Sequence, residues 1–321
     1  VSAVSPYQEH ALVGAMATHG RLNHFTDGFR LAYTIPATLD PTRLPASDEP
    51  FLRGKIVPNE AFVVLWSGGF NTWTDIDTLY NGVFQAMQEN PALHFVATGG
   101  SLPPHDSQTF PRFQKMVEAS EFRDRFHLLG WVSYEGLHNY YLESDVGLIL
   151  DRWSYEGILG SRTRLLDWLL YGLPAVVTVT AYLTEELVGE ELAFSFPHGS
   201  APDLAARLRE LAEDPDRLTS AAARSKTFVA ERYSYAAACR PLLEWVVNPR
   251  QAPDAGETLP SFAVAGNDND RDRLLAEYEA QIEAKNKALA SMESWAKEME
   301  TRLHKANPPS LYERLSRRFR H

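Results

Sequence analysis

Short apolar stretches alternate with amphipathic stretches through the middle of the chain, and this alternation limits the possible folds most strongly. The expected strands are residues 61–67, 93–98, 126–130, 145–150, 175–179 and 192–196, and the expected helices are 75–90, 109–120, 133–143, a segment before 175, 202–213, 215–231 and 236–247. Continuous apolar runs are typical of parallel strands buried on both faces. Because crossovers between parallel strands are right-handed, we expect a doubly wound α/β fold around a parallel sheet.

Two of the expected strands end in a pair of glycines. Gly68 and Gly69 follow the strand 61–67, and Gly99 and Gly100 follow the strand 93–98. Ligands of open α/β sheets bind beyond the carboxyl ends of the strands, and glycine lets the backbone approach a ligand closely. These glycines are therefore candidate ligand-binding positions. Neither pair belongs to a G-x-G-x-x-G motif, so the sequence does not support a nicotinamide cofactor.

The segment from Glu156 to Thr180 carries the charged residues that most need an explanation. It reads as a glycine-containing loop, an amphipathic helix, a Gly-Leu-Pro stop and a buried strand. Arg164 and Asp167 are three residues apart and share a helical face. Gly160 and Ser161 stand where the helix is expected to begin, and the free N–H groups of a helix start suit a phosphate. Since a carboxylate one turn further suits sugar hydroxyls, the segment predicts a sugar-phosphate site.

Each of these residues also has a plainer interpretation. Arg164 and Asp167 could form an exposed ion pair worth under about 1 kcal/mol, although the Gly-Leu-Pro stop and the neighbouring strand end favour a ligand role. Asp151, at a strand end, could contact the ligand, although a helix or loop cap is the commoner role of such a residue. Three tryptophans near strand ends read as core residues rather than stacking platforms: Trp66, Trp131 and Trp168.

The histidines do not indicate a functional site. His198 lies in a proline-containing loop and is expected to be solvated. Since the histidines form no H-x-x-x-H pattern, no metal site is predicted.

Charge and cysteine content narrow the class of protein. The formal net charge is -11, which argues against non-specific nucleic-acid binding by the whole chain. The lone cysteine, Cys239, excludes an internal disulfide and fits a reducing compartment. No run of 18 apolar residues is present, so no membrane-spanning helix is expected. We therefore expect a cytoplasmic protein.

The two ends of the chain differ from its middle. Residues 1–60 offer a helix at 7–19, a strand at 31–35 and several prolines, too little for a core of their own, so they read as the remnant of a preceding domain plus a connector. The chain starts without Met, which suggests a processed product or a fragment. Residues 61–247 form the main domain. Residues 248–267, with three prolines and two glycines, read as a linker.

Residues 268–305 carry a heptad pattern of apolar residues, broken only by Lys285: Leu275, Tyr278, Ile282, Leu289, Met292, Ala296, Met299 and Leu303. Four heptads favour a coiled coil and a homodimer, whereas a lone helix packed on the body would have a stripe that drifts from this one. Residues 308–321 hold four arginines and could form an amphipathic helix on an anionic membrane. The alternative for this end is a frayed, solvated terminus.

Residues 61–245 resemble the C-terminal, nucleotide-sugar-binding Rossmann-like domain of GT-B fold glycosyltransferases of the group 1 type. Three segments carry the resemblance. W-S-G-G-F-N-T-W-T-D (66–75) is similar to the first strand and glycine-rich loop of that domain, and F-H-L-L-G-W-V (126–132) to the strand that touches the nucleobase. D-W-L-L-Y-G-L-P-A-V-V (167–177) is similar to the end of the acidic motif, E-A-M-A-x-G-x-P-V-V.

The resemblance implies a role for each matching residue. Asp167 matches the second acid of the motif, which usually holds the ribose hydroxyls, and Arg164 matches a basic position suited to the diphosphate. Glu156 is the best match to the first acid, the catalytic contact to the donor sugar, although the two acids are eleven apart here instead of eight. The complete candidate donor site adds Gly68, Gly69, Asn71, Gly99, Gly100, Gly160, Ser161, Arg162 and Thr163. Asn71, Thr72 and Trp73 replace the Arg and Lys pair of the family.

The implied activity is a retaining, metal-independent glycosyl transfer in cell-surface polysaccharide synthesis. The donor would be a nucleotide-diphospho-sugar, with no other cofactor, and the acceptor a glycan or a lipid-linked molecule. Residues 1–60, with G-R-L-N (20–23), resemble the end of the acceptor domain. Most of that domain is missing, so it would come from the same or another chain, and this fragment alone could be inactive. The protein would lie in the cytoplasm or at the inner face of the membrane.

Two other functions stay open at this point. One is a non-catalytic, nucleotide-binding scaffold that dimerises through the coiled coil and docks a glycan-assembly complex. The other is a sugar-nucleotide epimerase of similar two-domain form, which would want acid and base residues that this sequence does not clearly show. The sequence names neither the sugar, the base nor the acceptor.

Overall fold

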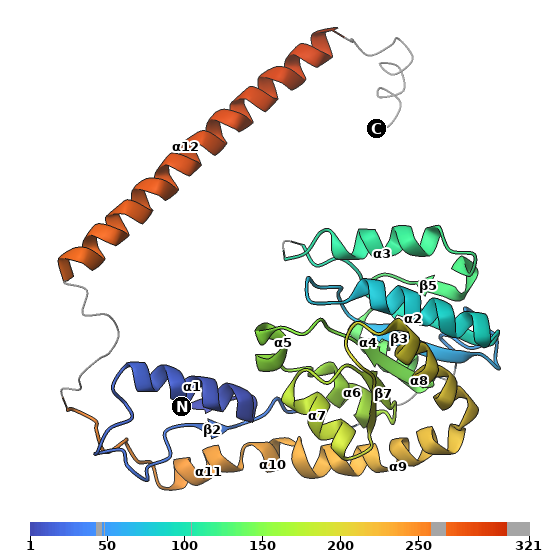
Figure 1. The fold of residues 1–321 in the computed structure, drawn as a ribbon, viewed down its shortest axis with the longest axis horizontal. Helices are drawn as coiled ribbons and strands as arrows, with labels where there is room; N and C mark the ends of the chain where they lie inside the picture. Colours follow the sequence, from blue (N-terminus) through green and yellow to red (C-terminus); the bar gives the residue numbers. More distant parts are fainter. Residues whose placement is uncertain (43–46, 48, 104, 258–267, 307–321) are drawn as a thin grey trace. The chain divides into compact units, whose positions relative to one another are not determined.

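The structure, a computed structural model, describes residues 1–42, 47, 49–103, 105–257 and 268–306 (Figure 1). The chain divides into two compact units, Val1–Leu259 and Pro260–His321. The first unit contains the sheet and its covering helices, and the second contains one long helix. Each unit is described separately.

The centre of the first unit is a parallel sheet in the strand order β5-β4-β3-β6-β7-β8. The strands are β3 (Phe62–Ser67), β4 (Leu93–Thr98), β5 (Phe126–Leu128), β6 (Val146–Ile149), β7 (Ala175–Val177) and β8 (Ala193–Ser195). The chain adds strands outward from β3 to β5, then returns to the other side of β3 and continues to β8. The expected doubly wound α/β fold is confirmed, and its switch point lies between β3 and β6.

Helices cover both faces of the sheet (Figure 1). One face is covered by α2 (Ile76–Glu89), α3 (Thr109–Glu118) and α8 (Ala201–Glu213), and the other contacts α4 (Tyr134–Leu142), α6 (Arg164–Leu170), α7 (Tyr182–Gly189) and α9 (Pro215–Arg232). The helix expected over 236–247 is instead two helices, α10 (Tyr235–Ala238) and α11 (Arg240–Val247), with Cys239 between them. Pro241 explains the break, because proline lacks the N–H that would donate to the Ala237 carbonyl oxygen in a continuous helix.

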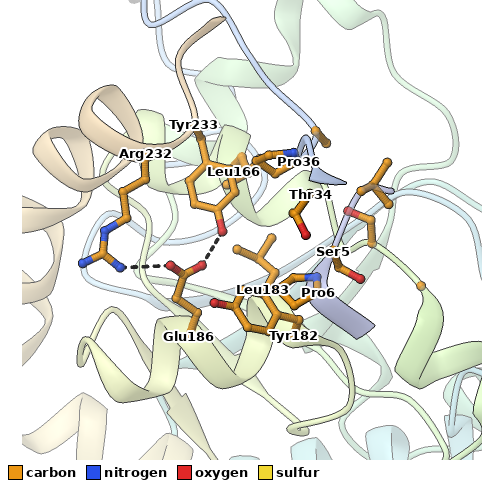
Figure 2. A pocket seen from close by; sticks show the side chains of 14 residues that line it. Ser5, Pro6, Thr34, Pro36, Leu166, Tyr182, Leu183, Glu186, Arg232 and Tyr233 are labelled. Atoms are coloured by element: carbon orange, nitrogen blue, oxygen red, sulfur yellow. Dashed lines mark hydrogen bonds and ion pairs between the residues drawn. The ribbon is translucent and has the colours of Figure 1, made fainter. Parts of the chain in front are cut away.

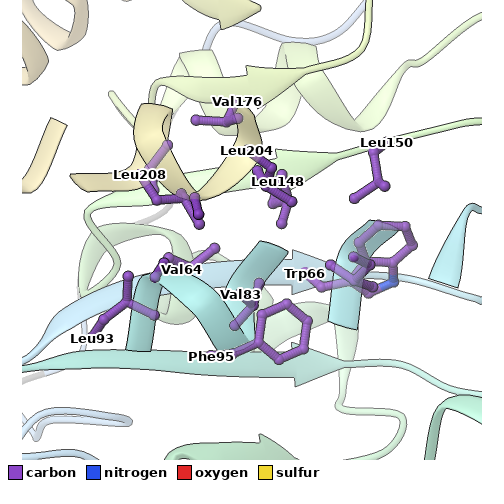
Figure 3. Close-up of a cluster of buried hydrophobic side chains, with 14 of the residues drawn as sticks. Val64, Trp66, Val83, Leu93, Phe95, Leu148, Leu150, Val176, Leu204 and Leu208 are labelled. Atoms are coloured by element: carbon purple, nitrogen blue, oxygen red, sulfur yellow. The ribbon is translucent and has the colours of Figure 1, made fainter. Parts of the chain in front are cut away.

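The core shows why the strands read as continuous apolar runs. Val64, Trp66 and Phe95 point to one face of the sheet, where α2 and α8 cover them, and Val63 and Leu65 point to the other. Figure 3 shows Val64, Trp66 and Phe95 in one cluster with Val83 of α2 and with Leu204 and Leu208 of α8. All are 2 % exposed or less. Because both faces are buried, no polar alternation appears along β3 or β4.

Two of the three tryptophans expected in the core are there. Trp66 and Trp168 are buried, and Gly147 in β6 makes room for Trp168, since a methyl group at Gly147 would overlap the indole. The prediction for Trp131 is wrong: its side chain is 59 % exposed, and its Nε1 donates to the carbonyl oxygen of Ser101 at 3.3 Å. Trp131 comes after the short strand β5 has ended, beyond the covering helices.

The N-terminal segment adds a small second sheet. β1 (Ser2–Ala3) pairs in parallel with β2 (Tyr33–Thr34), and α1 (Pro6–Thr18) lies between them in sequence. A bidentate ion pair joins this segment to residues 248–257, the described part of the expected linker: Arg21 Nε and Nη2 lie 2.6 and 2.8 Å from the Asp254 carboxylate. The Asp254 side chain is fully buried. The G-R-L-N sequence therefore serves as an anchor for the end of the first unit.

The second unit contains α12 (Asp268–Ala306), a helix of 39 residues. Six large apolar side chains along it are 50–67 % exposed: Leu275, Tyr278, Ile282, Leu289, Met292 and Trp295. The expected basic end at 308–321 lies outside the described residues. Within the described residues, no helix has the length and the apolar content needed to cross a membrane.

Candidate functional site

The glycine pairs at the strand ends hold two loops against each other. Gly68 N–H donates to the carbonyl oxygen of Thr98 at 2.9 Å, and Phe70 N–H donates to that of Gly100 at 3.0 Å. A side chain at Gly99 would overlap the carbonyl of Gly68, and Gly68 itself has a φ of +106°. These two glycines are therefore needed for backbone packing at the carboxyl edge of the sheet, whatever binds there.

Arg164 lies against the first of these loops. Its guanidinium donates to the carbonyl oxygen of Ser67, and a methyl group at Gly68 would lie 3.0 Å from its Cζ atom. The guanidinium also lies over the Trp66 ring, 5.9 Å from the centroid. Burial lowers the pKa of Arg164. It interacts with the charge of Asp151, but among the described residues it forms no direct ion pair with a carboxylate, so its guanidinium can also meet an anionic ligand.

Asp167 lies one helical turn after Arg164, yet the two side chains form no ion pair. Burial raises the pKa of the Asp167 carboxyl, and no hydrogen bond joins this carboxylate to another described residue. Its charge interacts with the nearby phenol of Tyr141, whose pKa burial raises to about 12. The plain interpretation of an exposed Arg164–Asp167 pair therefore does not describe this structure.

The turn before α6 differs from the expected one. A short helix, α5 (Tyr155–Leu159), precedes it and is capped by Ser154, whose hydroxyl accepts the Gly157 N–H at 2.9 Å. The next helix begins only at Arg164, not near Gly160. Residues 160–163 form an extended turn between the two helices. None of the backbone N–H groups of Ser161, Arg162 and Thr163 donates to another described residue.

Arg162 is paired within the protein. Its Nε lies 2.6 Å from the Asp151 carboxylate, and the two side chains are only 13 % and 5 % exposed. Asp151 follows β6, so this pair ties the turn to the sheet. Glu156 lies in the exposed first turn of α5 and forms no hydrogen bond or ion pair with a described residue. The structure thus brings Arg164 to the first glycine loop and Asp167 near Tyr141, whereas it shows no such contact for Glu156.

Asn71 lies in a tight turn that leads into α2. Its N–H donates to the Thr74 hydroxyl at 3.2 Å, and the Thr74 N–H donates back to its carbonyl oxygen at 2.9 Å. Trp73, two residues on, accepts the Arg152 N–H at 2.7 Å through its carbonyl oxygen. The segment 71–73, which stands in place of the Arg and Lys pair expected from the resemblance, therefore connects the loop after β3 to the loop after β6.

His198 was missed by sequence reasoning. Its Nδ1 lies 2.9 Å from the carbonyl oxygen of Asp151 and its Nε2 lies 3.1 Å from that of Val179. The ring therefore bridges the ends of β6 and β7, and the expectation that it is solvated is wrong. In the sequence, only the position of His198 after β8 could have indicated that its ring contacts the ends of neighbouring strands. Thr98, at the end of β4, was also missed, and its buried hydroxyl has no hydrogen-bond partner among the described residues.

A cavity of about 190 Å³ lies beside the turn 160–163 (Figure 2). It is lined by the N-terminal segment, the turn, α7 and the end of α9, including Ser5, Thr34, Ser161 and Tyr182. Glu186 closes one side, where it accepts hydrogen bonds from Arg232 at 2.9 Å and from the Tyr233 hydroxyl. In the described ranges, no three His, Cys, Asp or Glu side chains gather as a metal site.

Residues 61–214 match the family described as "Glycosyl transferases group 1". This part of the chain is therefore similar to the group 1 glycosyl transferases. The match spans the whole sheet and both glycine loops, and it includes Arg164 and Asp167. No curated protein matches the chain at a significant level.

Solved structures share the fold of this domain. S. aureus TarM is 11 % identical with a TM-score of 0.56, and the match covers 76 % of this chain and 43 % of TarM. Anabaena HepE, solved with UDP and glucose, is 14 % identical with a TM-score of 0.58, covering 77 % and 62 %. The pneumococcal O-GlcNAc transferase GtfA is 17 % identical with a TM-score of 0.55, covering 77 % and 44 %. This chain thus matches about half the length of these proteins.

Proposed function

We propose that the chain is the donor-binding half of a glycosyltransferase. It would transfer a sugar from a nucleotide-diphospho-sugar to a glycan or lipid-linked acceptor in cell-surface polysaccharide synthesis. The observation that carries this proposal is the pair Arg164 and Asp167, two charged side chains of α6 that lie at the carboxyl edge of the sheet without ionic partners among the described residues. Burying charge without a partner is costly, so such groups are expected where a ligand completes them.

The two side chains suit different parts of such a donor. The guanidinium of Arg164 would stabilise the negative charge that develops on the diphosphate as the sugar departs. The Asp167 carboxylate would accept hydrogen bonds from the ribose hydroxyls and thus orient the nucleotide. Since an arginine supplies the positive charge, we propose a metal-independent reaction, with retention of the anomeric configuration. Glu156 remains our candidate contact to the donor sugar.

Titration calorimetry tests the proposal. HepE and GtfA were solved with UDP, so the ligands are UDP, GDP, ADP and the corresponding nucleotide sugars. We expect one nucleoside diphosphate to bind, and Arg164→Ala to weaken it by at least about tenfold, the loss of one charge-assisted interaction. Arg209→Ala is the matched control, because Arg209 pairs with Glu89 away from the strand ends. If the wild-type chain binds none of these ligands, the proposal is wrong.

The finer chemistry needs the acceptor half, in the same or another chain. With both halves present, nuclear magnetic resonance of the first product formed gives the anomeric configuration directly. An inverted product would overturn retention. Activity that disappears with a chelator and returns with added Mg²⁺ would overturn metal independence.

A scaffold function is the second candidate, and the exposed apolar side chains of α12 favour it. In this proposal the helix forms a homodimer, and the basic end at 308–321 holds the protein at the inner face of a membrane, where it docks a glycan-assembly complex. Sedimentation before and after deletion of 268–321 tests the dimer. A monomer in both cases excludes it, and nucleotide binding without turnover in the presence of the acceptor half would favour the scaffold.

A further inference from the structure

We propose that Gln8 is a positioning residue for the turn 160–163, and thereby for the diphosphate of the donor; this inference rests on the proposed function. Gln8 lies in the first turn of α1, and its Nε2 donates to the carbonyl oxygen of Leu159 at 2.5 Å. Leu159 is the last residue of α5. This hydrogen bond joins the N-terminal segment to the turn that leads directly to Arg164.

The side chain of Gln8 is held in place from its own helix. The hydroxyl of Ser5, the N-cap of α1, accepts the Gln8 N–H at 3.2 Å, and Gln8 Oε1 accepts the Val4 N–H at 3.4 Å. This is a variant of the capping box, in which a residue at the third helical position returns to the backbone before the helix. Because the amide oxygen is bound there, the amide nitrogen is directed away from α1 and toward Leu159.

The bond to Leu159 controls where the turn begins. The last carbonyl groups of a helix have no partner within it, so Leu159 accepts from outside α5. The N–H of Gly160, in the same peptide unit, donates to the Gly157 carbonyl oxygen at 3.2 Å. Both ends of this peptide unit are therefore held, which fixes the direction in which the chain leaves α5. The free N–H groups of residues 161–163 follow directly and depend on that direction.

A second bond shows that α1 is fixed on the main domain rather than touching it at one point. The hydroxyl of Tyr7 donates to Glu185 of α7, and the rings of Tyr7 and Tyr182 meet edge to face at 5.7 Å. The cavity in Figure 2 is lined by Pro6 of α1 and Tyr182 of α7, and Ser161 is also among its lining residues. Neighbouring residues in one helical turn thus contact two separate elements of the main domain.

Two substitutions separate the role of the amide nitrogen from that of charge. Gln8→Glu keeps the oxygen that accepts the Val4 N–H and removes only the donor to Leu159, while adding a negative charge. Gln8→Met removes the donor without adding charge, and it also removes the oxygen that accepts the Val4 N–H. His10→Glu is the control, since it adds the same charge at an exposed position of α1. The full chain is used throughout, with UDP, GDP and ADP as probes in titration calorimetry and amide hydrogen exchange as a measurement that needs no ligand.

We expect both Gln8 variants to bind the preferred nucleoside diphosphate roughly three- to tenfold more weakly, the loss of one hydrogen bond. The amides of 161–163 should exchange faster in both variants without ligand, and His10→Glu should leave binding and exchange unchanged. Wild-type affinity with unchanged exchange in both variants, or weaker binding by Gln8→Glu alone, overturns the positioning role and leaves the proposed function intact. If the wild type binds no probe, the proposed function fails, and the exchange measurement alone decides whether Gln8 orders the turn.

Discussion

Substitution of Gly68 by alanine should damage the protein in two ways that can be measured separately. Gly68 has a φ of +106°, a region that costs a residue with a side chain about 1–2 kcal/mol. The new methyl group would also lie 3.0 Å from Cζ, Nη1 and Nη2 of Arg164, closer than ordinary contact. The guanidinium is bonded to Ser67, so relief requires it to move, and such overpacking costs about 1–3 kcal/mol. The expected total loss of stability is about 2–5 kcal/mol.

Two other glycines provide matched controls. Gly28 has a φ of +71° with nothing within 4 Å of a built methyl group, so Gly28→Ala carries the backbone strain alone, about 1–2 kcal/mol. Gly100 does not have a positive φ, and its methyl group would meet Phe110 at an ordinary 3.5 Å, so Gly100→Ala should change stability by less than about 0.5 kcal/mol. Gly100→Ala should therefore be the most stable of the three variants, and Gly68→Ala should be the least stable.

Urea unfolding followed by tryptophan fluorescence measures the three differences, and each 1 kcal/mol should lower Tm by roughly 2–4 °C. Displacement of Arg164 adds a second result: Gly68→Ala should also bind nucleoside diphosphate more weakly, whereas Gly28→Ala should not. If Gly68→Ala loses no more stability than Gly28→Ala, then the Arg164 guanidinium does not pack against Gly68. The position assigned to the cation of the candidate site would then be wrong.

Three further predictions concern stability and assembly. Burial lowers the pKa of His94 to about 4, and its Nδ1 lies 3.0 Å from Nε2 of His127. Since the unfolded chain binds the proton more readily, stability should fall as the pH drops from about 6.5 to 4. In urea unfolding between pH 7.5 and 5, His94→Gln should therefore lose about 2 kcal/mol less stability than the wild type. Leu289→Asp should turn an α12 dimer into a monomer by sedimentation, and Lys287→Asp, off the heptad seam, should not; equal results for both exclude the seam. Leu204→Ala empties a fully buried position and should cost about 2–5 kcal/mol, so a loss under 1 kcal/mol would contradict the packing of α8 on the sheet.

The sheet could be predicted because its cause is local. Each strand buried on both faces must be apolar throughout, and 61–67 or 93–98 reads that way without any knowledge of neighbours. The break at Cys239 was missed, because the apolar pattern of 236–247 favours one helix, although Pro241 lacks the N–H that a continuous helix would use. The exposure of Trp131 was also missed, because β5 ends at Leu128, earlier than the apolar run of the sequence indicates.

The site was predicted less completely, because its pairings depend on distance in space. Arg162 and Arg164 look equivalent in the sequence, two residues apart in the same turn. Only the return of the chain past β6 places Asp151 beside Arg162 and leaves Arg164 at the glycine loop. The bridge made by His198 has the same origin, since it joins the ends of two strands that are neighbours only in the folded sheet.

The distribution of ion pairs explains why α6 stands out. Three other partly buried arginines of the first unit pair with carboxylates, Arg21 with Asp254, Arg53 with Asp145 and Arg162 with Asp151, whereas Arg125 donates only to backbone carbonyl oxygens. On α6, by contrast, Arg164 and Asp167 are three residues apart, near enough to pair, yet each is directed elsewhere. Two partly buried charges of opposite sign that form no direct ion pair cost stability at this position, although Arg164 donates to Ser67 and interacts with the charge of Asp151. We expect such a loss of stability where a bound ligand compensates for it. A ligand with an anionic group would pair with Arg164, and its hydroxyl groups would donate to Asp167. A nucleotide sugar carries both kinds of group.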